Sequence, residues 1–174
     1  MIMVKKYLLV QGGGIRGAYV YGVLLGISEI LNDNCLDIFD EIYSSSASSC
    51  TMTYFLSNQA QNEGMKIWTE AVTRKEFIDK KRFYRILQKR IPYLNSYYLT
   101  EKIFRENPMS INYNELRKRI HKLHYSLFDV ERNKNQFITL ESNFKDEDIH
   151  TILHASIAMP VLYDRQVFFN GKNY

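Results

Sequence analysis

The order of hydrophobic and polar positions along the chain predicts alternating strands and helices. The apolar run at residues 5–10 predicts a buried strand, and residues 16–32 repeat apolar side chains at helical spacing. A second strand is expected at residues 36–43 (LDIFDEIY), and CTMTYFLS, residues 50–57, has a helical pattern. The chain therefore begins with two strand–turn–helix units, which indicates an α/β fold.

The rest of the chain adds helices and hairpins. Residues 63–91 have a helical pattern that ends before Pro92, and shorter helices are expected over 100–106 and 113–122. Residues 124–142 alternate apolar and polar side chains around a turn, which predicts a hairpin, and residues 146–159 predict a helix. Asn170-Gly171 is a strong signal for a hairpin turn. Three residues follow this turn, so we expect the second strand of the hairpin only to begin within the sequence.

Composition indicates one folded domain over residues 1–174. Hydrophobic residues make up 45% and charged residues 24%, which argues against disordered, collagen-like and coiled-coil classes. The two cysteines are too few for a disulfide framework, and they have no metal-ligand spacing with the four histidines, so no metal is expected. Because no apolar run approaches ~20 residues and no signal peptide is recognisable, we expect a cytoplasmic protein without a transmembrane segment.

The net charge of +4 is unevenly distributed. Residues 74–90 contain eight Lys and Arg residues against Glu76 and Asp79. Such a run is usually a solvated helix face. Aromatic residues lie between these charges, however: Phe77, Phe83 and Tyr84. A peripheral contact with a membrane surface is therefore an alternative interpretation.

The glycine-rich segment QGGGIRG, residues 11–17, lies between the first strand and the first helix. Backbone N–H groups at such a helix N-terminus favour an anion, either a pyrophosphate or the oxyanion of an acyl transfer. Residues 12–17 satisfy the dinucleotide pattern G-x-G-x-x-G, but Asp37 and Asp40 lie at the start of the second strand, where they would not reach a ribose. A P-loop is disfavoured because no Lys-Ser/Thr pair follows the glycines.

An oxyanion site requires a nucleophile on a second strand-to-helix turn, between small residues. The run Ser44-Ser45-Ser46-Ala47-Ser48 lies at that junction. Centring the G-x-S-x-G pattern on Ser46 places Ser44 and Ser48 at the two small positions, and we expect Ser48 to adopt a glycine-like backbone. A serine-rich helix cap without chemistry is the alternative interpretation.

Four motifs in order give the chain a resemblance to the patatin-like phospholipase family: GGGIRG, FDEIYSSSAS, ILHASIAMP and FFNGKNY. The resemblance implies a three-layer α/β/α fold with a mainly parallel central sheet. It further implies a lipid acyl hydrolase with a Ser-Asp dyad, no cofactor, a phospholipid or other lipid ester as substrate, and no nucleic-acid partner. By the same resemblance Ser46 is the nucleophile, and the oxyanion loop comprises Gly12, Gly13, Gly14, Arg16 and Gly17, with Arg16 buttressing it.

The sequence departs from the family pattern in two places. Serines stand at the glycine positions of the elbow, and the catalytic aspartate of the D-G-G motif is expected about two residues after Tyr174. Asp129 and Asp164 are not followed by glycines and are not assigned as the base. We therefore expect an incomplete domain whose C-terminal part is missing. An inactive lipid- or partner-binding module is the main alternative, and a nucleotide-binding α/β domain the second.

Overall fold

A computed structural model describes residues 4–78, 94–106, 108–158 and 166–174. Its main sheet has the order β1-β2-β3-β4. Strand β2 (Glu41–Ser45) pairs in parallel with β1 (Tyr7–Val10) and with β3 (Leu123–Asp129), while β4 (Lys134–Thr139) pairs antiparallel with β3. The mixed α/β fold with a mostly parallel central sheet is therefore confirmed.

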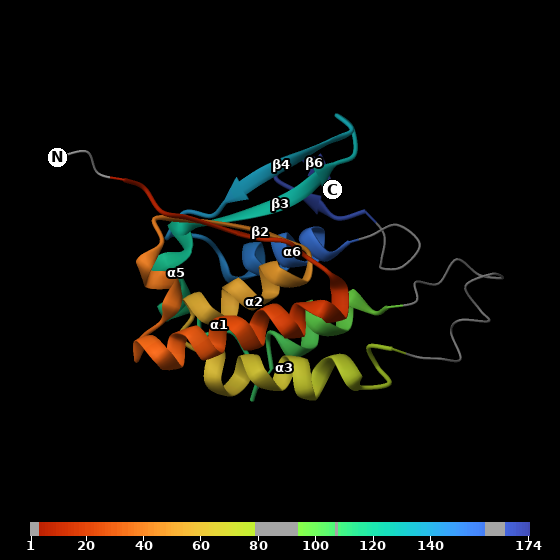
Figure 1. Ribbon diagram of the computed structural model, residues 1–174. Coiled ribbons are helices and arrows are strands. Elements are labelled where there is room, and N and C mark those ends of the chain that lie inside the picture. Colours follow the sequence, from red (N-terminus) through yellow and green to blue (C-terminus); the bar gives the residue numbers. More distant parts are fainter. Residues whose placement is uncertain (1–3, 79–93, 107, 159–165) are drawn as a thin grey trace.

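The long helices pack on one face of this sheet (Figure 1). They are α1 (Gly17–Leu31), α2 (Ala47–Leu56) and α6 (Asp146–Ile157); the short helices α3 (Met65–Thr69) and α5 (Tyr113–Arg119) flank them. Alternation along β3 explains the arrangement, because Leu123, Tyr125 and Leu127 are buried toward the helices while Phe128 is exposed on the opposite face.

Two predicted elements have different bounds in the structure. The strand expected at residues 36–43 is a 3-10 helix, Cys35–Ile38, followed by β2 at Glu41–Ser45. The Asn34 side chain causes this shift, since it accepts the backbone N–H of Leu36 and caps the short helix. In the described part of the long helix expected at residues 63–91, up to residue 78, the structure has a π-helix at Ala60–Gly64, α3, and a 3-10 helix at Ala71–Thr73 instead. Residues 79–93, with most of the predicted basic segment, lie outside the described residues.

Other predicted elements are close to the observed ones. The region expected to be helical near 100–106 is a π-helix at Tyr98–Ile103, and a 3-10 helix at Ile120–Lys122 follows α5. The hairpin of β3 and β4 and the helix α6 are confirmed.

The C-terminal hairpin is closed, which contradicts the expectation of a missing return strand. Strand β5 (Phe168–Phe169) pairs antiparallel with β6 (Lys172–Asn173), and Val167 and Tyr174 exchange backbone hydrogen bonds of 2.8 and 2.9 Å. Asn170 and Gly171 both have positive φ, 47° and 76°, as a tight hairpin turn requires. The Val130 N–H donates to the Asn173 carbonyl, so the hairpin is attached to the end of β3.

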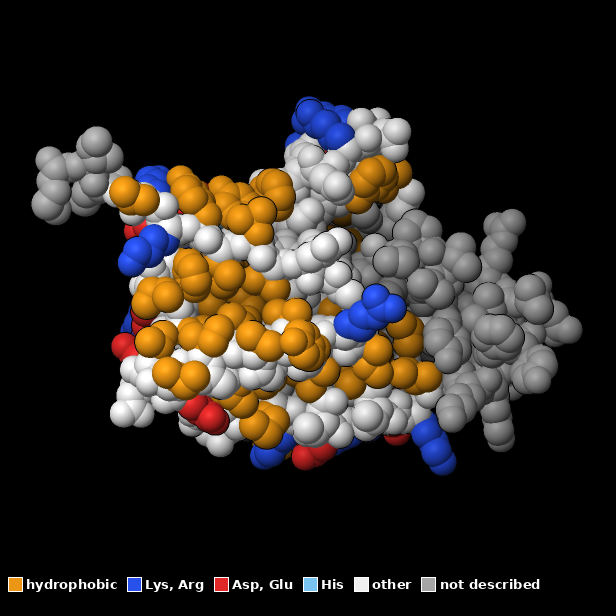
Figure 2. All heavy atoms as spheres, in the orientation of Figure 1, with side chains coloured by type: hydrophobic (Ala, Val, Ile, Leu, Met, Phe, Trp, Pro, Cys, Tyr) orange, Lys and Arg blue, Asp and Glu red, His pale blue; other side chains and the backbone are white. Residues whose placement is uncertain are grey.

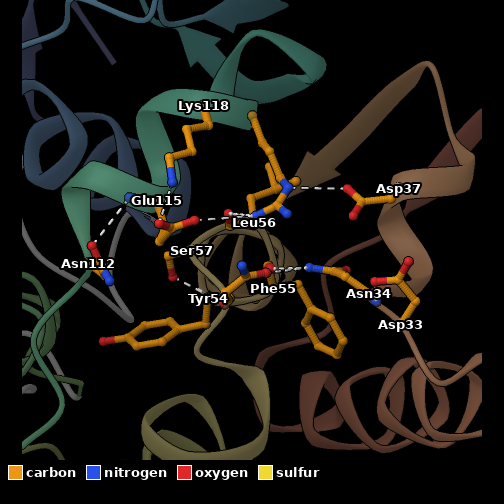
Figure 3. Close-up of polar contacts among 12 residues, drawn as sticks. Asp33, Asn34, Asp37, Tyr54, Phe55, Leu56, Ser57, Asn112, Glu115 and Lys118 are labelled. Carbon is orange, nitrogen blue, oxygen red and sulfur yellow. Dashed lines mark hydrogen bonds and ion pairs between the residues drawn. The ribbon is translucent and has the colours of Figure 1, made fainter.

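Polar side chains fix the C-terminal end of α2, where helix carbonyls lack partners within the helix (Figure 3). The Asn34 side-chain amide donates to the Phe55 carbonyl at 2.6 Å. Arg119 donates to the Leu56 carbonyl and forms an ion pair with Asp37 at 3.2 Å. Helix α2 is thus held at its far end, and its N-terminal end lies at the carboxyl end of β2.

Among the described residues, one helical stretch, Gly14–Leu31, is long and apolar enough to cross a membrane by length and composition alone. Glycines and polar residues interrupt its apolar pattern, so the stretch contains no continuous apolar run of the length that a span was expected to need. Only 22% of this stretch is buried. The core helix of a soluble protein or a signal sequence passes the same test, so the stretch by itself assigns no span; it does give α1 an apolar exposed surface.

Candidate functional site

The glycine loop and the serine run meet at one edge of the sheet. Strands β1 and β2 are parallel neighbours, with Val10 opposite Ser44, so both chains leave the sheet at their carboxyl ends side by side. In open α/β sheets this edge is where ligand sites form. The glycine loop and the serine run are therefore adjacent in the fold, as an oxyanion site requires.

Ser46 lies on a strained turn between β2 and α2. Its φ is 54° and its ψ is −131°, a backbone conformation that non-glycine residues rarely adopt. A strained serine between a strand and a helix is the geometry of a nucleophile elbow. Ser48, by contrast, lies within α2 and is not among the positive-φ residues, so the expectation of a glycine-like backbone at position 48 is wrong.

Gly12 is in direct contact with the elbow. A Cβ atom at this position would lie 2.5 Å from the Ser45 carbonyl oxygen and 2.6 Å from the Ser46 Cβ atom. The Gly12 N–H donates to the Ser45 hydroxyl at 2.9 Å. The first glycine of the loop therefore has no room for a side chain, and its N–H is already bonded.

The other residues of the loop differ in whether their backbone N–H groups donate a hydrogen bond. Arg16 N–H donates to the Gly13 carbonyl, and Gly17 N–H donates to the Gly14 carbonyl, which closes the turn into α1. Among the described residues, no hydrogen bond is made by the N–H groups of Gly13 or Gly14. Gly14 has a φ of 55°, and the Arg16 side chain packs beside Gly13. Within the described ranges, two of the five predicted loop residues, Gly13 and Gly14, thus have backbone N–H groups without a partner.

Ser48 joins the two strand ends through its hydroxyl. The Ser48 Oγ atom lies 2.7 Å from the Val10 carbonyl oxygen and 2.7 Å from the Ser45 carbonyl oxygen, and it accepts the Ser45 N–H at 3.2 Å. The side chain is completely buried. Serine at this position therefore connects the end of β1 to the elbow, which glycine could not do.

A chain of hydroxyl groups supports the elbow from α6. Ser156 accepts the backbone N–H of Ser46 at 3.0 Å, and its Oγ lies 2.7 Å from that of Ser49. Ser44 in turn donates to Ser49 at 3.1 Å. Sequence reasoning did not assign a role to Ser156 or Ser49; the only signal was the position of Ser156 within the ASIAMP segment.

An apolar cavity of about 80 Å³ adjoins the loop and the elbow. Gly14 and Ile15 form one part of its wall, and Ala47 and Cys50 of α2 form another. Burial raises the pKa of the Cys50 thiol to about 12, so this cysteine is a neutral wall residue rather than a nucleophile. The other described residues of the wall are also apolar: Ile67, Trp68, Val72, Phe77, Ile78, Leu94, Leu99, Phe104 and Ile157.

No general base is bonded to Ser46 within the described ranges. Asp129 is buried in the turn after β3, where it accepts hydrogen bonds from the Arg132 N–H and the Gln136 side chain. Asp164 lies outside the described residues. A search of the described residues finds no group of His, Cys, Asp and Glu that could hold a metal ion.

The acidic residues of the dinucleotide interpretation do not reach the glycine loop. Asp40 accepts the Lys6 N–H at 2.7 Å at the start of β1, and Asp37 is paired with Arg119. Both lie toward the amino end of β2, whereas the loop follows the carboxyl end of β1. A ribose-binding carboxylate is therefore not placed where that fingerprint needs one.

A parallel-sheet edge with a strained serine beside a glycine loop and an apolar cavity is typical of α/β proteins that carry a site at their strand ends. Residues 8–174 match the family model described as Patatin-like phospholipase, and the chain belongs to this family. The family generally hydrolyses lipid esters. Comparison with curated proteins gave no match.

Proposed function

We propose that this chain provides the nucleophile and the oxyanion site of a lipid acyl hydrolase. Ser46 attacks the ester carbonyl carbon, and its hydroxyl proton passes to an aspartate, as the resemblance to the family implies. The carbonyl oxygen becomes an oxyanion that accepts the free N–H groups of Gly13 and Gly14. The aspartic acid then returns the proton to the leaving alcohol, which leaves an acyl-Ser46 ester. A water molecule gives a proton to the aspartate and attacks this ester, and the proton returns to Ser46 as the fatty acid leaves.

The observation that carries this proposal is the strained backbone of Ser46 against Gly12. Strain of this kind costs on the order of 1–3 kcal/mol and persists only where surrounding contacts maintain it. Ser156 and Ser48 supply such contacts on either side of the elbow. A serine-rich helix cap would need neither the positive φ nor the close approach of the loop.

The apolar cavity supports a lipid acyl group as the part of the substrate that is recognised. Its wall is formed by apolar and aromatic side chains together with Gly14, and it begins beside the residue that follows Ser46. In the proposed mechanism the acyl chain occupies this cavity while the head group remains toward solvent. A peripheral association with lipid surfaces and a cytoplasmic location remain expectations from the sequence.

The test is ester hydrolysis by the 174-residue chain and by a polypeptide in which an Asp-Gly-Gly sequence follows Tyr174. Medium-chain p-nitrophenyl esters and phosphatidylcholine are the substrates. We expect little turnover by the shorter chain, because a serine hydroxyl without a base is a poor nucleophile, and a clear gain in the longer one. Ser46→Ala should abolish the gain, whereas Ser142→Ala, on an exposed turn, should retain it.

The outcome also separates the alternatives. Turnover that survives Ser46→Ala would contradict the assignment of the nucleophile. Binding of lipid esters without turnover in either polypeptide would favour the non-catalytic lipid-binding module instead.

A further inference from the structure

Trp68 of α3 lies on the wall of the apolar cavity, close to the elbow. It is half-buried and is the only tryptophan in the sequence. A Cβ atom on Gly17 would lie 2.5 Å from Cη2 of Trp68 and 3.3 Å from Cβ of Ala47, the residue that follows Ser46. The outer edge of the indole ring is therefore a close neighbour of both Gly17 and Ala47.

The contact with Trp68 explains why residue 17 is a glycine. The φ of −56° and ψ of −25° at Gly17 are ordinary helical values, which any residue can adopt. The reason is steric, because Cη2 and Cζ2 of Trp68 would lie 2.5 and 2.9 Å from an added Cβ atom. The N–H group of Gly17 already donates to the Gly14 carbonyl. The last glycine of the GGGIRG segment therefore makes room for the indole ring rather than for an anion.

A second glycine packs the start of α3 against α1 and α2. A Cβ atom on Gly64 would lie 2.8 Å from the Tyr21 hydroxyl oxygen and 3.0 Å from Tyr54 Cβ. Gly17 and Tyr21 are one turn apart and both are buried, so the two contacts hold α3 against the same side of α1. Helix α3 lies beside α1 in Figure 1, and Figure 2 shows hydrophobic side chains (orange) over this part of the molecule. The indole ring is thus a fixed part of the cavity wall.

The acyl chain of the proposed intermediate would begin at this part of the wall. In an acyl-Ser46 ester the carbonyl carbon is bonded to the Ser46 Oγ atom, so the next carbons of the chain lie beside Ala47. Ala47, Trp68 and Gly14 all line the cavity. The second carbon of the acyl chain therefore passes the indole ring before the chain reaches the rest of the cavity.

We propose that Trp68 is a specificity-determining residue, which selects acyl chains without a branch next to the carbonyl group. A methyl group on the second carbon would press against an indole ring that is backed by Gly17 and has no room to retreat toward α1. A methyl group at the other end of the chain lies away from this ring. The inference rests on the proposed hydrolase function, because that function places the carbonyl carbon at Ser46.

The binding of two isomeric fatty acids tests the inference without hydrolysis. 2-Methyloctanoic acid and 7-methyloctanoic acid have the same composition and differ only in the position of the branch. Isothermal titration calorimetry gives the affinity of the 174-residue chain for each. We expect the 7-methyl isomer to bind about 10- to 100-fold more tightly, the factor that corresponds to forcing an extra methyl group into a packed wall. It should also shift the fluorescence of Trp68 to shorter wavelength, because the ligand replaces water beside the ring.

Trp68→Ala should remove the preference, so that the two isomers bind with nearly equal affinity. Phe137→Ala is the matched control. Phe137 is an exposed aromatic residue, and its strand partner Ser126 alternates with the buried residues of β3 that face the helices. Phe137 therefore lies on the opposite side of the sheet from the cavity, and its removal should leave the preference unchanged.

A stability measurement tests the contact itself, even where Trp68→Ala folds poorly. Gly17→Ala should lower the denaturant concentration at the midpoint of unfolding, because the added Cβ atom collides with the indole ring. In the Trp68→Phe background the same change should lower the midpoint much less, since phenylalanine lacks the ring atoms that reach Gly17. Trp68→Phe should also bind the 2-methyl isomer more tightly than the unmodified chain does.

The outcomes for Trp68 and for Ser46 can be told apart. A polypeptide with Asp-Gly-Gly after Tyr174 that hydrolyses no ester would contradict the hydrolase function, while a branch preference that depends on Trp68 would still support the role of this ring in the cavity. Equal affinity of the unmodified chain for the two isomers, no binding of either, a preference that survives Trp68→Ala, or a neutral Gly17→Ala would each overturn the inference.

Discussion

The substitution Gly12→Ala should push the glycine loop away from the elbow without removing a hydroxyl group or changing a charge. The added Cβ atom would lie 2.5 Å from the Ser45 carbonyl oxygen and 2.6 Å from Ser46 Cβ. Non-bonded carbon atoms are most stable about 3.5–4.0 Å apart, so the loop must retreat by about 1 Å. The obstructing atoms belong to the backbone and to a Cβ atom, which cannot rotate aside.

The size of the effect follows from this displacement. Forcing backbone to shift around an added methyl group costs about 1–3 kcal/mol. The hydrogen bond from the Gly12 N–H to Ser45, now 2.9 Å, lengthens in the same movement. A 1 Å displacement of catalytic groups can cost ~100-fold in rate, and loss of one oxyanion donor costs a similar factor. We therefore expect lower stability and, in any active form, about 100-fold slower ester hydrolysis.

Gly22→Ala is the matched control. Its Cβ atom meets nothing within 4 Å, so the same chemical change should stabilise the protein by about 1 kcal/mol and leave hydrolysis unchanged. Denaturant unfolding gives the stability of both variants, and p-nitrophenyl ester hydrolysis gives the rate. Unchanged stability and rate in Gly12→Ala would refute the conclusion that the loop is pressed against the elbow.

Three further changes test other contacts by denaturant unfolding. Ser156→Ala removes the acceptor of the elbow N–H and should cost about 1–3 kcal/mol, whereas Ser142→Ala should cost almost nothing. Ser48→Gly should destabilise by about 1–2 kcal/mol, and a neutral effect would contradict the role given to its hydroxyl. Burial lowers the pKa of His150 to about 4, so its unfolded state binds a proton first as the pH falls. The contribution of neutral His150 to the free energy of unfolding should be fully present above about pH 6.5, and it should fall by about 3 kcal/mol toward pH 4. His150→Asn should reduce this pH dependence, and an unchanged pH dependence in this variant would contradict the assignment to His150.

The parts of the fold that could be predicted from the sequence are those fixed by local periodicity. Helix α1 has apolar side chains at helical spacing over its whole length, and the expected helix at residues 16–32 is observed as Gly17–Leu31. The turn at Asn170-Gly171 is equally local, because its two positive φ angles suit those residue types. Strand β2 begins at Glu41 rather than at residue 36, because the Asn34 side chain caps a 3-10 helix over Cys35–Ile38, where the strand was expected.

The contacts around the candidate site depend on residues far apart in the sequence. Ser156 supports Ser46 across 110 positions, and no local pattern reports such a hydrogen bond. The glycine loop was recognisable because its residue types limit what the backbone can do there. The sequence could not show which N–H groups of the loop are hydrogen-bonded. The Gly12 N–H donates to the Ser45 hydroxyl, and these two residues are neighbours only in the folded sheet.

The serines at the two glycine positions of the elbow have a physical explanation in these contacts. The turn places its strain on Ser46, with a φ of 54°, so the flanking positions need small side chains but not a glycine backbone. Ser44 and Ser48 are 2% and 0% exposed, and each hydroxyl is bonded, to Ser49 and to the Val10 carbonyl. Glycine at position 48 would leave that carbonyl without the Ser48 donor at the end of β1. The serine run is therefore a hydrogen-bonded form of the same tight turn, and it holds the glycine loop and Ser46 together.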